Sequence, residues 1–416
     1  MSSLGGYRDK RIRVLYSFPH KLGAGRICYT AWEQVNGLAG AGAEVIAFPG
    51  VLQRRVAPEV TVRPTLAFGK LRASYKLLGA LRACAIHDYI VSRRIEKLAG
   101  RIDIIHTWPL GALRTLRAAR RLGIPTVLER PNAYTAYAYD VVRKECDRLG
   151  VVLPPGSEHV YNEEVLRRET AEYDAADQLL CPSDFVVDSF VAKSFPPHRL
   201  TRHVYGYDET RFYPGRRTAR AEGGMTMLFA GYAAVRKGVH IALEAWLRSP
   251  ASRAGQFLIA GEFATVYADK LRNMLSHPSV KVLGHRKDVP DLMRQSDVMV
   301  LPSLEEGFGL VCVEAMGCGC VPLVSNACTD VCKHMENAMV HRVGDTDTLC
   351  QHITALRDNP ALLASLREGA LATAPTVTWA AAGAKLLQAY ADVIRSYRSH
   401  LGPLATVAPG ETVSRR

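Results

Sequence analysis

The sequence predicts an α/β protein built from two facing, doubly wound domains with a cleft between them. A chain of 416 residues is too long for one ordinary hydrophobic core, because single cores stop growing beyond about 250–300 residues. Short apolar runs alternate with longer helical patterns twice along the chain, which predicts two parallel sheets covered by helices. A stretch rich in turn-forming residues separates the two series.

The first series covers residues 1–205 and is expected to form an N-terminal Rossmann-like domain on one side of the cleft. Its apolar runs are four or five residues long and lie between helical patterns, which is typical of buried parallel strands. We expect strands at 12–16, 44–48, 102–106, 125–128 and 178–181, helices at 29–40, 110–122 and 163–177, and a helix cap at 182–184.

The second series follows a predicted linker at residues 206–224 and covers residues 225–378. We expect strands at 225–230, 257–260, 280–283, 298–301 and 321–324, and a helix at 239–248. The tail 401–416 contains Gly402, Pro403, Pro409 and Gly410 and is predicted to be disordered. Because ligands of doubly wound sheets bind beyond the carboxyl ends of the strands, the chemistry is expected between the domains.

The composition indicates a globular protein, with 48% hydrophobic residues, 22% charged residues and a mean hydropathy of -0.03. Residues 1–10 are polar and lack the apolar stretch of a signal peptide, and no segment approaches the length of a membrane span. A cytoplasmic location is therefore expected. The 10 cysteines are scattered, and Cys318, Cys320, Cys328, Cys332 and His334 lack a paired zinc-ligand spacing, so no metal is expected.

The net charge of +13 favours an anionic partner. Many of the cations lie between Lys70 and Arg121, where apolar residues recur at helical spacing. Two interpretations stay open: solvated helix faces, or a surface for an anionic acceptor or for the inner face of an anionic membrane. No nucleic-acid-binding motif accompanies the charge, so nucleic acid is not an expected partner.

The strongest functional motif is a glycine turn that follows the predicted strand 298–301 and opens a helix. In this turn Gly307 and Gly309 flank Phe308, and glycine lets a backbone come close to a ligand. The N–H groups from Gly309 and Leu310 onward would bind a diphosphate at the helix N-terminus. Glu306 and Glu314 would then accept hydrogen bonds from sugar and ribose hydroxyls.

A second motif places cations after another strand. The strand ends at Gly231, and Arg236 and Lys237 follow it before a predicted helix. Cations at this position would stabilise the charge of a departing diphosphate.

Together these motifs resemble the retaining glycosyltransferases of the GT-B fold, group 1, family 4. Glu306 and Glu314 match the E-x7-E motif of that family, and Lys237 resembles its diphosphate-binding lysine. The resemblance implies a nucleotide-diphosphate sugar as co-substrate, no metal or other cofactor, and front-face transfer in which the leaving diphosphate helps deprotonate the acceptor. Where many relatives carry an arginine after the strand glycine this chain has Tyr232, and Arg236 is the expected replacement.

Weaker matches extend the resemblance over most of the chain. His285 corresponds to a position near the nucleotide base, while Gly23 and Gly25 resemble a loop of the first domain that faces the donor phosphates. The helix 379–400, which begins at Trp379, resembles the C-terminal helix that crosses back to the first domain.

The main departure from the family lies in the segment 128–134. Relatives carry a histidine here that contacts the donor sugar, whereas this chain has Tyr134, with Asn132 two residues earlier. A tyrosine can keep one hydrogen bond but lacks the acid–base range of imidazole. His106 is a candidate substitute at the edge of the cleft, but a structural histidine is the interpretation that we favour.

The sequence therefore predicts a retaining glycosyltransferase that moves a hexose-type sugar from a nucleotide-diphosphate donor to a glycan, lipid or small-molecule acceptor. We expect the donor to bind the C-terminal domain and the acceptor to bind mainly the N-terminal domain. A sugar-nucleotide epimerase of the same fold and a sugar-nucleotide-binding protein without catalysis remain as alternatives. A dehydrogenase is disfavoured because the segment 15–25 lacks a G-x-G-x-x-G sequence.

Overall fold

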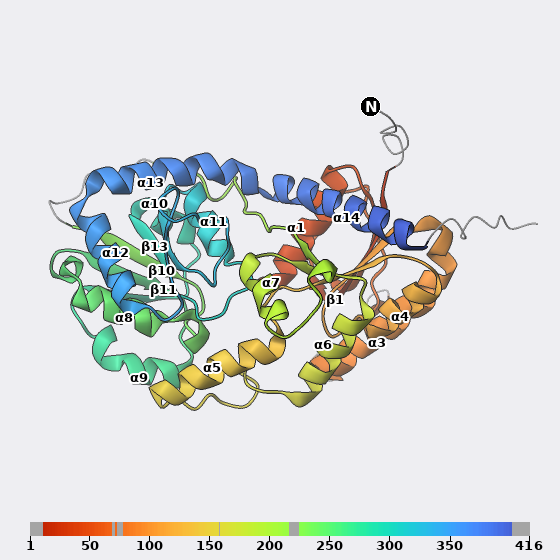
Figure 1. The fold of residues 1–416 in the computed structure, drawn as a ribbon, viewed down its shortest axis with the longest axis horizontal. Helices are drawn as coiled ribbons and strands as arrows, with labels where there is room; N and C mark the ends of the chain where they lie inside the picture. Colours follow the sequence, from red (N-terminus) through yellow and green to blue (C-terminus); the bar gives the residue numbers. More distant parts are fainter. Residues whose placement is uncertain (1–10, 69–70, 73–77, 158, 216–223, 402–416) are drawn as a thin grey trace, which may run out of the picture.

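The computed structural model describes residues 11–68, 71–72, 78–157, 159–215 and 224–401. Two parallel sheets, each covered by helices, lie side by side along the long axis of the molecule (Figure 1). The predicted α/β architecture with two doubly wound units is therefore confirmed. The expectations for residues 1–10, for Lys70, for part of the linker and for the tail beyond residue 401 lie outside the described residues.

The first sheet has seven strands in the order β3-β2-β1-β6-β7-β8-β9, and every neighbouring pair is parallel. The order reverses beside β1, so β1 and β6 flank the point where ligands of such sheets bind. The strands are β1 (Arg13–Leu22), β2 (Glu44–Leu52), β3 (Thr61–Val62), β6 (Ile104–Thr107), β7 (Thr126–Glu129), β8 (Gln178–Cys181) and β9 (Leu200–Arg202). A small antiparallel hairpin joins β4 (Ala67–Phe68) to β5 (Leu71–Arg72).

The helices of the first half cover both faces of this sheet. They are α1 (Ile27–Gly40), α3 (Ala80–Arg94), α4 (Leu113–Arg121), α5 (Thr135–Leu149), α6 (Glu163–Ala175) and α7 (Asp184–Val191), with the short 3-10 helices η1 (Ile95–Arg101) and η2 (Pro197–Arg199). The predicted cap at 182–184 is confirmed, because the Ser183 side chain accepts the Val186 N–H at the start of α7.

The second sheet has six parallel strands in the order β12-β11-β10-β13-β14-β15. These are β10 (Thr226–Ala230), β11 (Gln256–Ala260), β12 (Val280–Gly284), β13 (Val298–Leu301), β14 (Val321–Ser325) and β15 (Met339–His341). The helices around them are η3 (Val235–Lys237), α8 (Val239–Arg248), η4 (Pro250–Arg253), α9 (Thr265–Leu275), α10 (Val289–Gln295), α11 (Leu310–Gly317), α12 (Thr346–Asp358), α13 (Pro360–Thr373) and η5 (Ala374–Val377).

The central strands β13 and β14 are buried along their whole length and are apolar except for Ser325 at the end of β14, as expected for parallel strands covered on both faces. The sequence locates them within one residue because a continuous run of buried β-branched and apolar residues is a strong signal.

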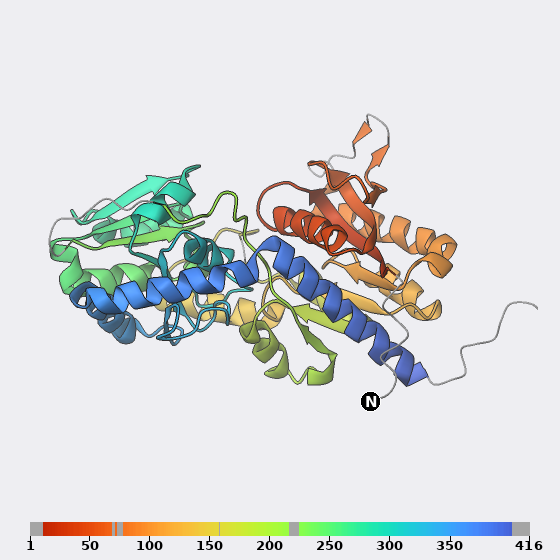
Figure 2. The same ribbon diagram turned by 90° about the horizontal axis from the view of Figure 1, so that it is seen from above.

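The last helix, α14 (Trp379–Leu401), runs from the second sheet back over the first (Figures 1 and 2). Its Leu386 and Tyr390 pack into the same hydrophobic cluster as Val14 of β1 and Val35 of α1. The contact between α1 and α14 is close, because a Cβ atom at Gly383 would lie 2.5 Å from the Gly37 carbonyl carbon. Only glycine permits this approach at position 383, and the space at Gly37 is also tight.

Helix α5 crosses in the opposite direction. It leaves β7 of the first sheet, yet its Val142 and Cys146 belong to the hydrophobic core of the second half. Glu145 of α5 accepts a hydrogen bond at 2.7 Å from His240 of α8. The two halves are therefore held together by one helix from each.

No helix in the described ranges combines the length and the apolar character needed to cross a bilayer.

Candidate active site

The glycine turn of the second half lies directly against the first half. It follows β13 and ends at Gly309, whose φ of +76° at the N-cap of α11 favours glycine. A Cβ atom at Gly307 would lie 1.6 Å from the Pro131 carbonyl oxygen, so this position admits only glycine. Ser183 of the first half donates a hydrogen bond to the Gly307 carbonyl oxygen at 2.6 Å. The turn therefore lies at the junction of the two halves, where the cleft was predicted.

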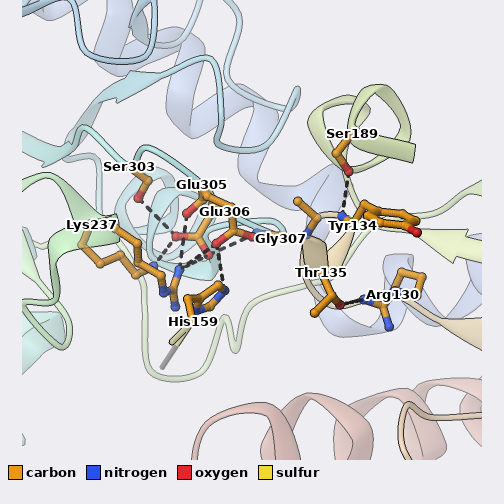
Figure 3. Close-up of polar contacts among 12 residues, drawn as sticks. Arg130, Tyr134, Thr135, His159, Ser189, Lys237, Ser303, Glu305, Glu306 and Gly307 are labelled. Atoms are coloured by element: carbon orange, nitrogen blue, oxygen red, sulfur yellow. Dashed lines mark hydrogen bonds and ion pairs between the residues drawn. The ribbon is translucent and has the colours of Figure 1, made fainter. Parts of the chain in front are cut away.

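Glu306 is the centre of a group of charges beside this turn (Figure 3). Its carboxylate forms an ion pair with Lys237 and accepts hydrogen bonds from Ser303 Oγ at 3.2 Å and from the Gly307 N–H at 3.3 Å. Arg236 Nη1 lies 3.7 Å from Glu306 Oε1. Burial alone would raise the pKa of this carboxyl, but Lys237 and Arg236 hold it below its ordinary value. Glu306 is therefore ionised and positioned between two cations.

The cations reach Glu306 because η3 is fixed against the glycine turn. Gly238 has a φ of +67°, and a Cβ atom there would lie 2.1 Å from the Pro302 carbonyl oxygen. The Leu304 N–H also donates to the Arg236 carbonyl oxygen at 2.7 Å. The backbone of Gly231, after β10, lies similarly close to that of Gly261, which follows the neighbouring strand β11. A Cβ atom at Gly261 would lie 1.7 Å from the Gly231 carbonyl oxygen. The two sequence motifs therefore form one site.

Glu305 is a second buried carboxylate, which the sequence did not single out. It accepts the Ala133 N–H at 3.2 Å, and its Oε2 atom lies 3.1 Å from His159 Nε2 and 3.9 Å from Arg236 Nη1. Burial opposes ionisation, yet His159, Arg236 and the Ala133 N–H lower the pKa of Glu305 to about 2. Glu305 thus binds two separate segments of the first half, the loop after β7 and the loop that carries His159.

Glu314 lies in the second turn of α11 and has a different environment. Burial raises its pKa to about 7; Arg211 partly opposes this and Asp208 adds to it. Both neighbours belong to the segment that connects the two sheets. The Tyr29 hydroxyl of α1 lies 3.5 Å from Oδ2 of Asp208. Glu314 is therefore next to a segment that contacts the first half.

The loop with Gly23 and Gly25 also lies at the junction. Gly23 has a φ of +85°, and a Cβ atom there would lie 2.4 Å from Arg54 Cβ, whereas Gly25 lies in open space. The guanidinium of Arg26, the next residue, lies 5.8 Å from the ring centre of Tyr232. This loop therefore meets the strand end at Gly231, where the diphosphate is expected.

Tyr134 does not point toward the charged group. Its ring packs against Tyr173 and Phe190, at 5.4 Å and 5.2 Å between ring centres, and its N–H donates to Ser189 Oγ at 2.9 Å. Figure 3 shows the ring directed away from Lys237 and Glu306. Asn132, in contrast, lies beside the glycine turn, with its Cα 3.3 Å from the position of a Gly307 Cβ atom.

His106 does not line a cleft, so its candidacy as a substitute is wrong and the structural interpretation favoured from the sequence is confirmed. The residue is fully buried, with Nδ1 2.5 Å from the Tyr390 hydroxyl and Nε2 3.4 Å from Glu129. It is a structural histidine because β6 directs it toward α14 rather than toward the second half. His285 is exposed just beyond β12, an edge strand of the second sheet.

The structure brings together Glu306, Lys237, Arg236, Gly307 and Gly309, as the two motifs predicted. Sequence reasoning missed Glu305, His159 and Arg26. Glu305 directly precedes a predicted site residue and could have been suspected from that position. His159 lies 146 residues before Glu305 in an irregular loop, and no sequence pattern indicates that they meet.

Among the described residues, no group of three or more histidine, cysteine, aspartate or glutamate side chains is arranged to hold a metal ion. The positive charges beside Glu306 come from the side chains of Lys237 and Arg236.

The sequence of this chain is similar to those of known glycosyltransferases. Residues 224–359 match the family of group 1 glycosyl transferases. A D-inositol 3-phosphate glycosyltransferase from Catenulispora acidiphila is 29% identical over 329 residues, which cover 72% of this chain and 74% of the relative. A second one, from Salinispora arenicola, is 24% identical over 415 residues, covering 90% and 88%.

Two solved structures are similar over nearly the whole chain. Sucrose-phosphate synthase from Thermosynechococcus elongatus has a TM-score of 0.65 at 17% identity, covering 93% of this chain and all of that one. Anabaena Alr3699/HepE, solved in complex with UDP, has a TM-score of 0.60 at 15% identity, covering 94% and 100%. At these identities the likeness concerns the fold.

Proposed function

We propose that this chain is a group 1 glycosyltransferase of the GT-B fold, a hexosyltransferase that transfers a hexose-type sugar from a nucleotide diphosphate with retention of configuration. The observation that carries the proposal is the group of Lys237, Arg236 and Glu306 beside the N-terminus of α11. Such a group offers cations and backbone N–H groups to a diphosphate and a carboxylate to sugar hydroxyls.

In the proposed complex the diphosphate lies against the N-terminus of α11 and is contacted by Lys237. The ion pair between Lys237 and Glu306 positions the lysine before the donor arrives. Glu306 then binds hydroxyls of the transferred sugar, and Glu314 accepts hydrogen bonds from the ribose. Anabaena HepE, a structural neighbour, was solved with UDP, which supports a uridine or related nucleotide as the donor carrier.

The proposed transfer takes place on one face of the sugar. The bond from C1 to the diphosphate oxygen breaks while a bond from C1 to the acceptor oxygen forms on the same side. The acceptor proton passes to the leaving phosphate oxygen. The protein then has to stabilise negative charge on the diphosphate, which Lys237, Arg236 and the helix N-terminus are suited to do without a metal ion.

We propose a sugar or polyol as the acceptor, with a phosphorylated polyol as the first candidate. The two relatives described above are named for D-inositol 3-phosphate, and the first half carries a cavity of about 470 Å³. Its lining includes Arg114, Arg117, Arg167 and Arg168, together with the acidic Asp88, Glu164 and Glu172. These arginines also leave open a lipid-linked acceptor and a peripheral contact with an anionic membrane on the cytoplasmic side.

The test is release of nucleoside diphosphate from UDP-glucose, UDP-galactose, UDP-N-acetylglucosamine and GDP-mannose, with and without acceptor. The acceptors are D-inositol 3-phosphate, myo-inositol, glucose and a crude lipid extract. We expect release that depends on an acceptor, and a product whose anomeric configuration by NMR equals that of the donor.

Interconversion of free sugar nucleotides would instead indicate an epimerase. Tight binding without turnover would indicate a sugar-nucleotide-binding protein. This alternative is favoured by Tyr134, whose ring packs against Tyr173 and Phe190 and does not point toward the charged group.

A further inference from the structure

The loop between β1 and α1 brings an arginine to the junction of the two halves. Arg26 is exposed and stands at the N-cap of α1, with a φ of +59° and a ψ of -137°. Non-glycine residues rarely adopt such a conformation, which costs stability and is found most often at functional sites. The backbone of this loop therefore favours glycine at position 26, and only the side chain offers a reason for arginine.

The guanidinium of Arg26 reaches the second half of the molecule. It lies over the ring of Tyr232, 5.8 Å from the ring centre, and the tyrosine is itself 37% exposed. The face of an aromatic ring attracts a positive charge, so this contact holds the guanidinium in place. Because Tyr232 follows Gly231 at the end of β10, the contact joins the loop after β1 to the loop after β10.

These two loops lie where each sheet is expected to bind a ligand. The strand order reverses beside β1 in the first sheet and beside β10 in the second. Ligands of doubly wound sheets bind at such reversals, beyond the carboxyl ends of the strands. The glycine turn follows β13, the neighbour of β10, and so flanks the same reversal in the second sheet. Arg26 therefore lies where the proposed donor site meets the first half.

The charged group of the second half is balanced between cations and carboxylates. Lys237 and Arg236 carry two positive charges, and the ionised carboxylates of Glu306 and Glu305 carry two negative ones. A nucleoside diphosphate brings further negative charge, and a partly buried site has to match that charge with cations. A third cation at the same crevice, such as Arg26, would therefore favour its binding.

We propose that Arg26 binds the diphosphate of the sugar nucleotide from the first half, with its guanidinium donating hydrogen bonds to phosphate oxygens. The planar fork of a guanidinium suits phosphate in this way. This inference rests on the proposed transferase function and assigns a donor contact to the domain expected to bind the acceptor. Tyr232 acts through Arg26 as a positioning residue, because its ring holds the guanidinium beside the end of β10 before the donor arrives.

The competing role is purely structural, a tie in which Arg26 and Tyr232 only hold the two loops together. Two substitutions separate the roles, because each removes one partner. Arg26→Gln keeps a polar, non-glycine side chain at the position but removes the charge. Tyr232→Leu removes the ring and leaves the arginine in place. A tie would be lost equally in both variants, whereas a phosphate contact depends mainly on the arginine.

The measurement is calorimetric titration of the full chain with UDP, and with uridine as the ligand that lacks phosphates. We expect Arg26→Gln to weaken UDP binding at least about 10-fold, the effect of one lost charge-assisted hydrogen bond, and to leave uridine binding unchanged. Tyr232→Leu should weaken UDP binding only about threefold, and should add nothing in the Arg26→Gln background. Arg121→Gln removes an equal charge at the exposed end of α4 and is the matched control.

Equal UDP affinities in the wild type and Arg26→Gln would overturn the inference. An equal loss in Arg26→Gln and Tyr232→Leu would also overturn it, because that result shows a tie between loops. So would a loss of uridine binding as large as the loss of UDP binding, which indicates a distorted site. Thermal unfolding of each variant checks that the fold is intact. A wild-type protein that binds neither UDP nor GDP would contradict the proposed function itself, whereas UDP binding that Arg26→Gln leaves unchanged contradicts this inference alone.

Discussion

At the scale of single residues, the site depends on charges that are held in place before any ligand binds. Lys237 and Arg236 approach Glu306 because Gly238 and Gly307 allow backbone contacts that no other residue permits. Preorganised charges of this kind stabilise developing negative charge without rearrangement during the reaction. The two glycines are therefore as necessary to the site as the charged side chains.

Removing either charge should reduce turnover strongly and leave the fold intact. We expect Glu306→Ala or Lys237→Ala to lower the rate of transfer at least about 10²-fold, the effect of losing one preorganised contact. The measurement is steady-state release of nucleoside diphosphate at saturating donor. Glu244→Ala, an exposed glutamate of α8, and Lys281→Ala, an exposed lysine of β12, are matched controls. Near-normal activity in both site variants would refute the assignment.

The raised pKa of Glu314 predicts that donor binding depends on pH. Its pKa is raised to about 7 by burial, so it is partly protonated near neutral pH. Ribose hydroxyls bind the ionised carboxylate more tightly, and a ligand that prefers the ionised form binds better as the pH rises through that pKa. We expect the affinity for UDP to rise up to about 10-fold between pH 6 and pH 8.

The comparison that isolates this effect is Glu314→Gln titrated over the same range. Ionisation of the UDP phosphates affects both proteins equally, so the difference between their curves belongs to Glu314. Identical curves for the two proteins would show that Glu314 does not contact the donor.

At the scale of helices and strands, α5 and α14 connect the two halves, and the sequence predicted only one of them. Strands β10, β13 and β14 were located within one residue because continuous apolar runs define buried parallel strands. Helix α5 was not predicted, since Val142 and Cys146 find their partners only in the second half. Tyr134 was considered a site residue because relatives carry a histidine at that position. The sequence could not show that its ring packs against Tyr173 and Phe190, which are distant along the chain.

The contact of α5 with α8 predicts an acid-sensitive contribution to stability. Burial would raise the pKa of Glu145, but His240 and Arg148 lower it to about 2. A carboxyl with a lowered folded-state pKa stabilises the protein above its ordinary pKa, and this contribution is lost as the pH falls from about 4.3 toward 2. We expect Glu145→Gln to lower the Tm by about 2–4 °C at pH 7, roughly the value of one charge-assisted hydrogen bond.

At pH 3 the difference in Tm between wild type and Glu145→Gln should shrink. Arg143→Gln, which changes an exposed ion pair on the same helix, serves as the control and should have little effect at either pH. An undiminished difference at pH 3 would contradict the assigned protonation.

At the scale of the whole molecule, the two halves are held at a fixed approach by contacts on several sides of the junction. Helix α14 packs on α1 through Gly37 and Gly383, and the glycine turn of the second half lies against Pro131. The connecting segment is anchored by Tyr205, whose hydroxyl donates to the buried Glu129 at 2.9 Å. The site is therefore assembled by the arrangement of the halves and not by one domain alone.

Separating α14 from α1 should disturb both stability and turnover. We expect Gly383→Val to cost about 1–3 kcal/mol, because its side chain must displace the backbone at Gly37. Thermal unfolding and the kcat of transfer are the measurements, and both should fall. Ala380→Val adds similar bulk at an exposed position of the same helix and should change neither. Wild-type behaviour of Gly383→Val would show that the close approach is not required.

The central claim is that the glycine turn, Lys237 and the two glutamates form a donor site for a nucleotide-diphosphate sugar. Calorimetric titration with UDP tests it most directly, because it requires neither the correct sugar nor an acceptor. We expect saturable binding at one site per chain, weakened at least about 10-fold in Lys237→Ala and unchanged in Lys281→Ala. No binding of UDP or GDP to the wild-type protein, or equal affinities in all three proteins, would contradict the claim.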